Sequence, residues 1–193
     1  MPENNFKSRA AQVLSRGFRV IPIEPRGKKP LIAEWPSKAT AGQGAIDSWA
    51  EQFPDANVGL VAGDTVTLDF DSPRFLMEFF PEFPKTFVVK TGGGGYQVHF
   101  LATEESRVRL SNLAVRNEDQ ERWGKSETLI EVKAANAYGI GPGSVHPNGN
   151  TYQVFKDLPL APISTGLIDK VLGVQQRPLV EAGLTHPAFG NWE

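Results

Sequence analysis

The segment Val66-Thr67-Leu68-Asp69-Phe70-Asp71 alternates polar and apolar residues, which is typical of a β-strand with one face in the core. Successive side chains of a β-strand point to opposite faces, so Leu68 and Phe70 can enter a core while Asp69 and Asp71 share the other face. Two carboxylates this close repel each other unless a cation lies between them, and Mg²⁺ and Mn²⁺ prefer oxygen ligands. The pair therefore suggests a metal site, although an isolated Asp-x-Asp is more often a solvent-facing polar strand face.

A third acid, Glu131, lies in the otherwise apolar segment Leu129-Ile130-Glu131-Val132-Lys133. A carboxylate in an apolar strand is costly unless it is paired or binds a metal. Alternation places Lys133 on the same face, where it could simply shield Glu131. With Asp69 and Asp71, Glu131 would complete a two-metal site if the two strands are adjacent, which the sequence alone does not show.

Four consecutive glycines interrupt the segment from Lys90 to Phe100. Glycines expose backbone N–H groups and allow close approach of a ligand, so we expect Gly93, Gly94 and Gly95 to bind phosphate. No Gly-Lys-Ser/Thr follows, so the segment is not a Walker A loop. A flexible hairpin loop is the alternative.

Gln97 and His99 share one face of the strand that follows the glycines. His99 could hold a phosphate or act as a general acid beside one. A half-buried histidine that forms a hydrogen bond to a neighbouring strand is the plainer alternative, and for His99 taken alone the better one.

A second constrained loop runs from Gly139 to Tyr152 and carries Ser144 and His146 two residues apart. The two polar tips could face a nucleotide together, or they could serve the turn itself. The pattern Gly-x-Ser-x-Gly of serine hydrolases is absent, and the three histidines are too scattered to indicate zinc.

The bulk properties are those of an ordinary globular protein: 193 residues, 40% hydrophobic, without cysteine. We expect one domain over residues 1–173 and a tail or linker over 174–193. No apolar run approaches the roughly 20 residues that cross a bilayer, so we expect a cytoplasmic protein without a membrane partner. The formal net charge of −2 gives no global support for nucleic-acid binding, which leaves local contacts such as Lys28, Lys29, Lys90 and Lys133.

Periodicity and turn residues predict an α+β fold of short strands and a few helices. We expect 57–62 and 66–71 to form a hairpin and the polar stretch 103–126 to separate two strands. The expected helices are a segment from residue 6 with a stop at Gly17, and the segments 44–53, 73–80 and 163–172. The expected strands are 18–23, 57–62, 66–71, 87–90, 96–101, 128–133, 138–141 and 151–155.

The order of these motifs resembles the bifunctional primase-polymerase domain of plasmids and phages, within the archaeo-eukaryotic primase superfamily. The resemblance covers about residues 11–152. No single motif in it is specific, but the ordered set is. It consists of Gly27-Lys28-Lys29-Pro30, Trp35, Trp49, Asp55-Ala56-Asn57-Val58-Gly59-Leu60, Gly63, Leu68-Asp69-Phe70-Asp71, Thr91 to Phe100, Glu131, Gly141-Pro142-Gly143-Ser144-Val145-His146-Pro147, Gly149 and Tyr152.

The resemblance implies an archaeo-eukaryotic primase-like fold, with a mixed or antiparallel RRM-like catalytic sheet and flanking helices. It implies that Asp69 and Asp71 bind Mg²⁺ or Mn²⁺ and that Glu131 stands where many members have aspartate. Gln97 departs from the family, which has histidine directly after the glycine-glycine-aromatic unit, so His99 or Gln97 itself would take over. The expected catalytic residues are Asp69, Asp71, Glu131 and His99, and the expected nucleotide-binding residues are Gly93, Gly94, Gly95, Gln97, His99, Lys133, Ser144, His146 and Lys29.

The resemblance also implies the activity: template-dependent transfer of nucleotides to a 3′-hydroxyl in plasmid, phage or mobile-element replication. The partners would be DNA template or primer, an NTP or dNTP, and a replicative helicase in cis or in trans. A catalytically weak or inactive nucleic-acid-binding relative that acts as a replication adaptor is the main alternative, and Gln97 favours it. A metal-dependent nuclease or phosphodiesterase could use the same acids.

Overall fold

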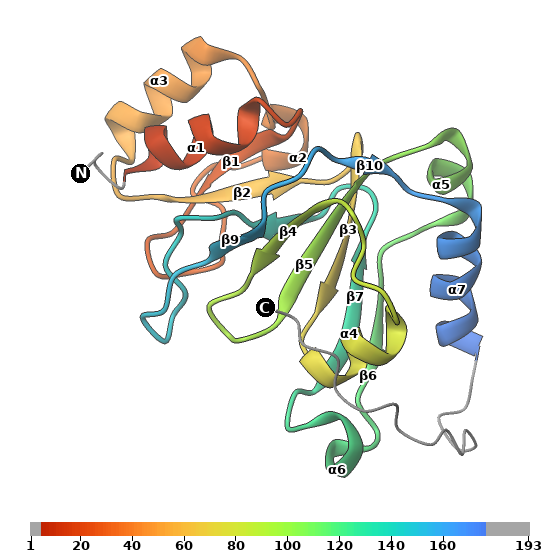
Figure 1. Ribbon diagram of the computed structural model, residues 1–193. Helices are drawn as coiled ribbons and strands as arrows, with labels where there is room; N and C mark the ends of the chain where they lie inside the picture. The colour runs from red at the N-terminus through yellow and green to blue at the C-terminus, as the bar shows by residue number, and fades with distance from the viewer. Residues whose placement is uncertain (1–4, 177–193) are drawn as a thin grey trace.

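Two β-sheets organise the computed structural model, which describes residues 5–176 (Figure 1). The smaller sheet has the order β1-β2-β8, and the larger has the order β6-β7-β3-β5-β4-β9 with the short β10 beside β5. Every pairing is antiparallel except that of β10 with β5. The strands are β1 (Arg19–Ile23), β2 (Asn57–Val61), β3 (Thr65–Phe70), β4 (Phe87–Lys90), β5 (Tyr96–Leu101), β6 (Leu113–Arg116), β7 (Thr128–Lys133), β8 (Tyr138–Ile140), β9 (Gln153–Lys156) and β10 (Ala161–Pro162).

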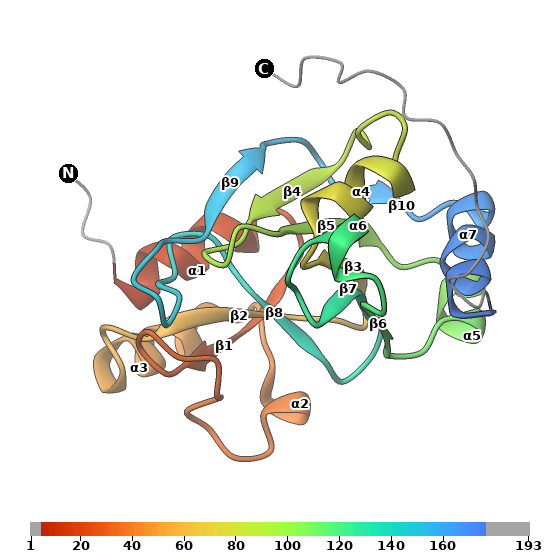
Figure 2. The same ribbon diagram turned by 90° about the horizontal axis from the view of Figure 1, so that it is seen from below.

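Seven helices surround the sheets in the described part of the chain (Figures 1 and 2). None of them is long and apolar enough to cross a membrane. The first begins at a capping box, in which the Asn5 side chain accepts from the Ser8 amide. The helices are α1 (Phe6–Leu14), α2 (Trp35–Lys38), α3 (Gln43–Gln52), α4 (Pro73–Phe79), α5 (Glu104–Arg109), α6 (Gln120–Trp123) and α7 (Thr165–Gln176).

The central strands β3, β4 and β5 of the larger sheet are buried on both faces because a separate apolar core lies on each side. On one face, Leu68 and Phe70 of β3 pack among the phenylalanines of α4 and against α7. On the other face, Phe87 and Val89 of β4 belong to the core that the smaller sheet shares with α1 and α3. The alternation in β3 thus directs Leu68 and Phe70 into the first core and turns Asp69 toward the smaller sheet.

The expected hairpin between 57–62 and 66–71 is wrong. Both strands form, but β2 pairs with β1 and β8, whereas β3 pairs with β5 and β7. At Gly63, whose φ is +137°, the chain leaves one sheet and enters the other. A turn signal fixes only that the chain changes direction, while the strand partners are chosen by long-range packing.

The polar stretch 103–126 is also more structured than expected, since it contains α5, β6 and α6. The capping box at Thr103 and Ser106 starts α5. The last helix begins at Thr165 and passes through Gly173 to Gln176, so the predicted tail starts inside this helix. The rest of the predicted tail, residues 177–193, lies outside the described part. The other expected helices and strands are confirmed to within a few residues.

Candidate active site

Asp69 occupies the centre of the larger sheet, between two strands that each present a polar side chain at the same level. Glu131 on β7 and Gln97 on β5 are its direct cross-strand partners. Side chains at paired positions of adjacent antiparallel strands lie on the same face about 5 Å apart at Cβ. Strand pairing thus brings together Asp69 and Glu131, which are far apart in sequence.

The ammonium group of Lys133 contacts both carboxylates. Its Nζ lies 3.4 Å from Asp69 Oδ2 and forms a second ion pair with Glu131 Oε2. The side chains of Lys133 and Asp69 are 13% and 15% exposed, against 44% for Glu131. The Lys133 ammonium thus bridges the two acids, and Glu131 is the more exposed of them.

Neighbouring charges shift the pKa values of Asp69 and Lys133. Desolvation, followed by the negative charge of Glu131, raises the pKa of Asp69, and Lys133 only partly offsets this. Desolvation would lower the pKa of Lys133, but the charges of Asp69 and Glu131 outweigh it and the pKa is raised. Lys133 therefore stays charged, and the pair of acids is held together by a positive group.

Asp71 follows β3 directly and is exposed. Desolvation and the charges of Asp69 and Glu131 raise its pKa to about 6. Lys28 opposes this shift, which places the Arg26–Pro30 turn within electrostatic reach of Asp71. Three acids and two lysines thus share one electrostatic neighbourhood.

Gln97 orients Asp69. Its Nε2 donates to Asp69 Oδ2 over 3.1 Å, and the residue is only 3% exposed. Its Oε1 is buried without a hydrogen-bond partner among the described residues and faces Gly139 of β8, where an added Cβ would lie 3.0 Å from that oxygen. Gln97 is therefore a positioning residue behind Asp69, and its amide is not open to a triphosphate, which corrects the predicted nucleotide contact.

Tyr152 is a site residue to which no role was assigned from the sequence. It is 4% exposed, and burial together with the charges of Asp69 and Asp71 raises its pKa. Its ring lies 5.9 Å from that of His146. Tyr152, the last residue of the second constrained loop, is therefore buried within electrostatic reach of both acids. Its place in the Gly-x-x-Tyr end of that loop was the only sequence signal.

The glycine loop joins β4 to β5 and packs against both the acid strand and the second loop. A Cβ on Gly95 would overlap the carbonyl oxygen of Phe70, directly before Asp71, and a Cβ on Gly92 would overlap the side chain of His146. Gly93 has only ordinary clearance, with His146 Nε2 3.7 Å from where its Cβ would be. The structure thus places Gly95 directly beside the end of the strand that carries Asp69 and leads into Asp71, and Gly93 beside His146.

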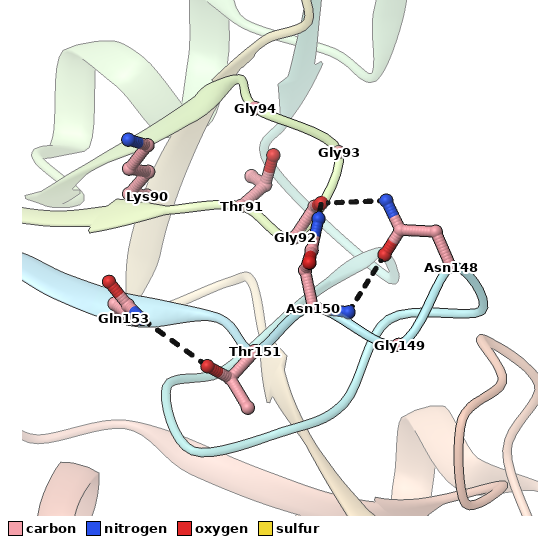
Figure 3. Close-up of a pocket in the computed structure, with 10 residues that line it drawn as sticks. All are labelled: Lys90, Thr91, Gly92, Gly93, Gly94, Asn148, Gly149, Asn150, Thr151 and Gln153. Carbon is pink, nitrogen blue, oxygen red and sulfur yellow. Dashed lines mark hydrogen bonds between the residues drawn. The ribbon is translucent and has the colours of Figure 1, made fainter.

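A hollow of about 560 Å³ opens between these two loops (Figure 3). The side-chain amides of Asn148 and Asn150 both donate to the Gly92 carbonyl, at 2.9 and 3.1 Å, and so tie the loops together. No acidic residue lines the hollow, whose wall is formed by Lys90, Thr91, Gly92, Gly93, Gly94, Asn148, Gly149, Asn150, Thr151 and Gln153.

Two predicted site residues do not reach this region. His99 is fully buried between the rings of Phe18 and Phe87, at 5.2 and 5.6 Å, and its Nδ1 lies 2.9 Å from Thr67 Oγ1. Burial, and to a lesser extent the charge of Lys133, lowers the pKa of His99 to about 3, so it is neutral and shielded rather than a general acid. Because Val98 and Phe100 enter the core on the α4 side, alternation along β5 turns His99 into the opposite core, between the two sheets.

Ser144 is likewise fully buried, and its hydroxyl accepts from the Val58 amide of β2 over 3.0 Å. It supports the fold, and the predicted contact with a nucleotide does not fit this position. Lys29 is exposed, but the lysine of that turn that acts on Asp71 is Lys28, whose carbonyl accepts from the Tyr138 hydroxyl.

The donor set suits a hard divalent cation, because Asp69, Asp71 and Glu131 offer only carboxylate oxygens. Within residues 5–176, however, no three such side chains are already arranged around a common point. The Lys133 ammonium stands where a cation between Asp69 and Glu131 would stand. The residues therefore fit Mg²⁺ or Mn²⁺ provided that Lys133 moves aside, which its flexible stem permits.

Comparison with known proteins identifies a family for the chain. A search of curated proteins finds no match. A family model does match: residues 10–165 correspond to the bifunctional DNA primase/polymerase N-terminal domain, Prim-Pol. This span contains all three acids, the glycine loop and the second constrained loop. The members of this family are nucleotidyltransferases that act on DNA, and the chain belongs to the bifunctional DNA primase/polymerase family.

Proposed function

We propose that the chain is a template-dependent DNA primase/polymerase that transfers nucleotides to a 3′-hydroxyl with two divalent cations, Mg²⁺ or Mn²⁺. Asp69, Asp71 and Glu131 would hold the cations. One observation carries the proposal: a single positive group already touches Asp69 and Glu131, which lie far apart in the sequence. By family likeness we place the reaction in plasmid, phage or mobile-element replication, with a helicase in cis or in trans.

In this reaction the 3′-hydroxyl attacks the α-phosphate of an NTP or dNTP, a P–O bond forms, and the bond to the β-phosphate breaks to release pyrophosphate. The bound cations would supply charge stabilisation at the attacking and leaving oxygens. Gln97 fixes the rotamer of Asp69 through its 3.1 Å hydrogen bond.

Lys133 would have two successive roles in this reaction. Without cations it neutralises Asp69 and Glu131. When cations replace it, its ammonium is free to meet an oxygen of the triphosphate, in keeping with the nucleotide-binding role expected from the sequence. The exposed Gly93 and the Nε2 atom of His146 lie beside each other, and both would contact the phosphates of the incoming nucleotide.

Primer extension tests the proposal. A labelled primer on a template is incubated with either nucleotide type and with Mg²⁺ or Mn²⁺. We expect extension by the wild type and none by Asp69→Ala or Glu131→Gln, while Glu127→Gln, an exposed acid just before β7, keeps full activity. Shortening of the primer in the absence of nucleotides would instead identify a nuclease.

A non-catalytic, DNA-binding relative is the second candidate. Two observations favour it: Gln97 replaces the histidine expected there, and a lysine occupies the space between the acids. Equal behaviour of wild type and Asp69→Ala in every nucleotide mixture, together with retained DNA binding, would support this adaptor role.

A further inference from the structure

The outer edge of the larger sheet carries aromatic and basic side chains that the proposed reaction does not use. Lys90 on β4 is the direct cross-strand partner of both Tyr96 on β5 and Gln153 on β9, so the three share one face. Phe155 joins this face through its contact with Tyr96. We call this surface the edge platform, and it consists of Phe83, Lys90, Tyr96, Gln153, Phe155 and Lys156.

The aromatic rings of the edge platform form one cluster. The ring centroids of Tyr96 and Phe155 lie 5.0 Å apart, and those of Phe83 and Phe155 lie 5.4 Å apart. Phe155 is 38% exposed, although it lies in a sheet whose interior phenylalanines, such as Phe70 and Phe87, are fully buried. A large apolar ring held firmly by two others while open to solvent is a surface on which a nucleobase can stack.

Positive charge accompanies the rings. The Nζ of Lys156 lies 4.6 Å from the centroid of Phe83. Lys90 is exposed and has no ion pair with a described residue. Asp157, next to Lys156, is engaged by Arg16. The edge platform is therefore locally basic in a chain whose net charge is −2.

The edge platform continues into the hollow beside the glycine loop, because Lys90 and Gln153 belong to both (Figure 3). The polar groups of the hollow include the Lys90 ammonium, the Thr151 hydroxyl and the Gln153 amide, with no carboxylate among them. Such a lining suits a phosphodiester group, and the neighbouring rings suit the base attached to it.

We propose that the edge platform binds single-stranded nucleic acid, with bases stacked on Phe155 and Tyr96 and a backbone phosphate in the hollow beside Lys90. The inference rests on the proposed function in one respect, the expectation that the chain works on a DNA strand. The strand would pass along β4 and β9, outside the acid cluster, and the glycine loop would separate it from the nucleotide.

Fluorescence anisotropy with a labelled oligo-dT in the presence of EDTA tests the platform without the metal-dependent chemistry. We expect Phe155→Ala to weaken binding about tenfold, as for the loss of one stacked base. Lys90→Gln is expected to reduce the slope of log K against log salt concentration by about 0.7 in magnitude, as for one lost phosphate contact. Matched controls are Val108→Ala, an 85% exposed valine on α5, and Lys7→Gln on α1, both of which should bind as wild type.

Phe155→Trp provides a positional readout. A tryptophan keeps a stacking surface, so affinity should be retained, and its added fluorescence should be quenched by oligo-dT. Unchanged binding by Phe155→Ala and Lys90→Gln, or tighter binding of duplex than of single strand, would overturn the platform.

Asp69→Ala separates the two proposals. We expect it to bind oligo-dT as wild type and to lose extension. If Phe155→Ala binds oligo-dT and extends primers normally, the platform alone is rejected. If the wild-type protein binds oligo-dT, Phe155→Ala weakens that binding, and the wild type extends no primer, the enzymatic proposal alone is rejected.

Discussion

Asp69 on β3 and Glu131 on β7 are direct cross-strand partners whose carboxylates share the ammonium of Lys133. Two like charges at paired positions are destabilising unless a positive group lies between them. The sheet therefore holds the two acids in a geometry that demands a cation, and Lys133 meets that demand when no other ion does.

Replacing Lys133 by Met should lower the free energy of unfolding by about 1–3 kcal/mol in EDTA, because the carboxylates lose their counter-charge and the exposure of Glu131 limits the cost. Mn²⁺ should then raise the melting temperature more in the variant than in the wild type, since it need not displace an ammonium. Thermal melts with and without Mn²⁺ measure both effects, with Lys38→Met as the exposed control. If Mn²⁺ raised the melting temperature equally in the two proteins, the proposal that Lys133 occupies the cation site would be contradicted.

The glycine loop allows steric and functional effects to be separated. Gly95→Ala should be destabilised by about 1–3 kcal/mol, because its Cβ would overlap the Phe70 carbonyl. Gly93→Ala has room and should fold normally, yet its methyl group should raise the KM for the nucleotide by blocking close approach. Urea unfolding and steady-state kinetics measure these outcomes. A normal KM in Gly93→Ala would remove this loop from the nucleotide site.

Ser144→Ala should act on stability alone. The hydroxyl is fully buried and accepts from the Val58 amide, so its loss leaves a buried donor unpaired at a cost of about 1–3 kcal/mol. The KM for the nucleotide should stay at its wild-type value when activity is measured well below the melting temperature. A raised KM with unchanged stability would restore the nucleotide contact expected from the sequence.

Because the buried His99 has a lowered pKa, we expect the stability of the protein to depend on pH. Its pKa is about 3 in the folded protein against 6.5 for an ordinary histidine, so between these values the unfolded chain binds the extra proton. The free energy of unfolding should therefore fall as the pH drops below 6.5, and the contribution of this one group reaches about 2 kcal/mol at pH 5. Urea unfolding of wild type and His99→Gln at pH 7 and pH 5 isolates that contribution. The same pH slope in both proteins would show that His99 is not held neutral.

Much of the site was predictable because it depends on local periodicity. The alternation in residues 66–71 determines that Asp69 and Asp71 leave the core that receives Leu68 and Phe70. The glycine run and the strands on either side of it are equally local. The order of these motifs along the chain was sufficient to indicate the primase/polymerase family.

Long-range packing determined the rest. The turn at Gly63 suggested a hairpin, but the edges of β2 and β3 are filled by strands from elsewhere in the chain. From the sequence, His99 could be functional or could bond to a neighbouring strand, and Ser144 could face a nucleotide or serve the turn. Only the tertiary structure shows that both are buried, with His99 beside Thr67 of β3 and Ser144 hydrogen-bonded to β2.

Sequence alone thus established which side chains share a face of a strand, because that follows from backbone geometry over two residues. It could not establish which strands are neighbours. The pairing of Asp69 with Glu131, the bridging ammonium of Lys133 and the burial of Tyr152 near the acids arise only when distant segments bury their apolar faces together. That burial selects the strand order of the sheet.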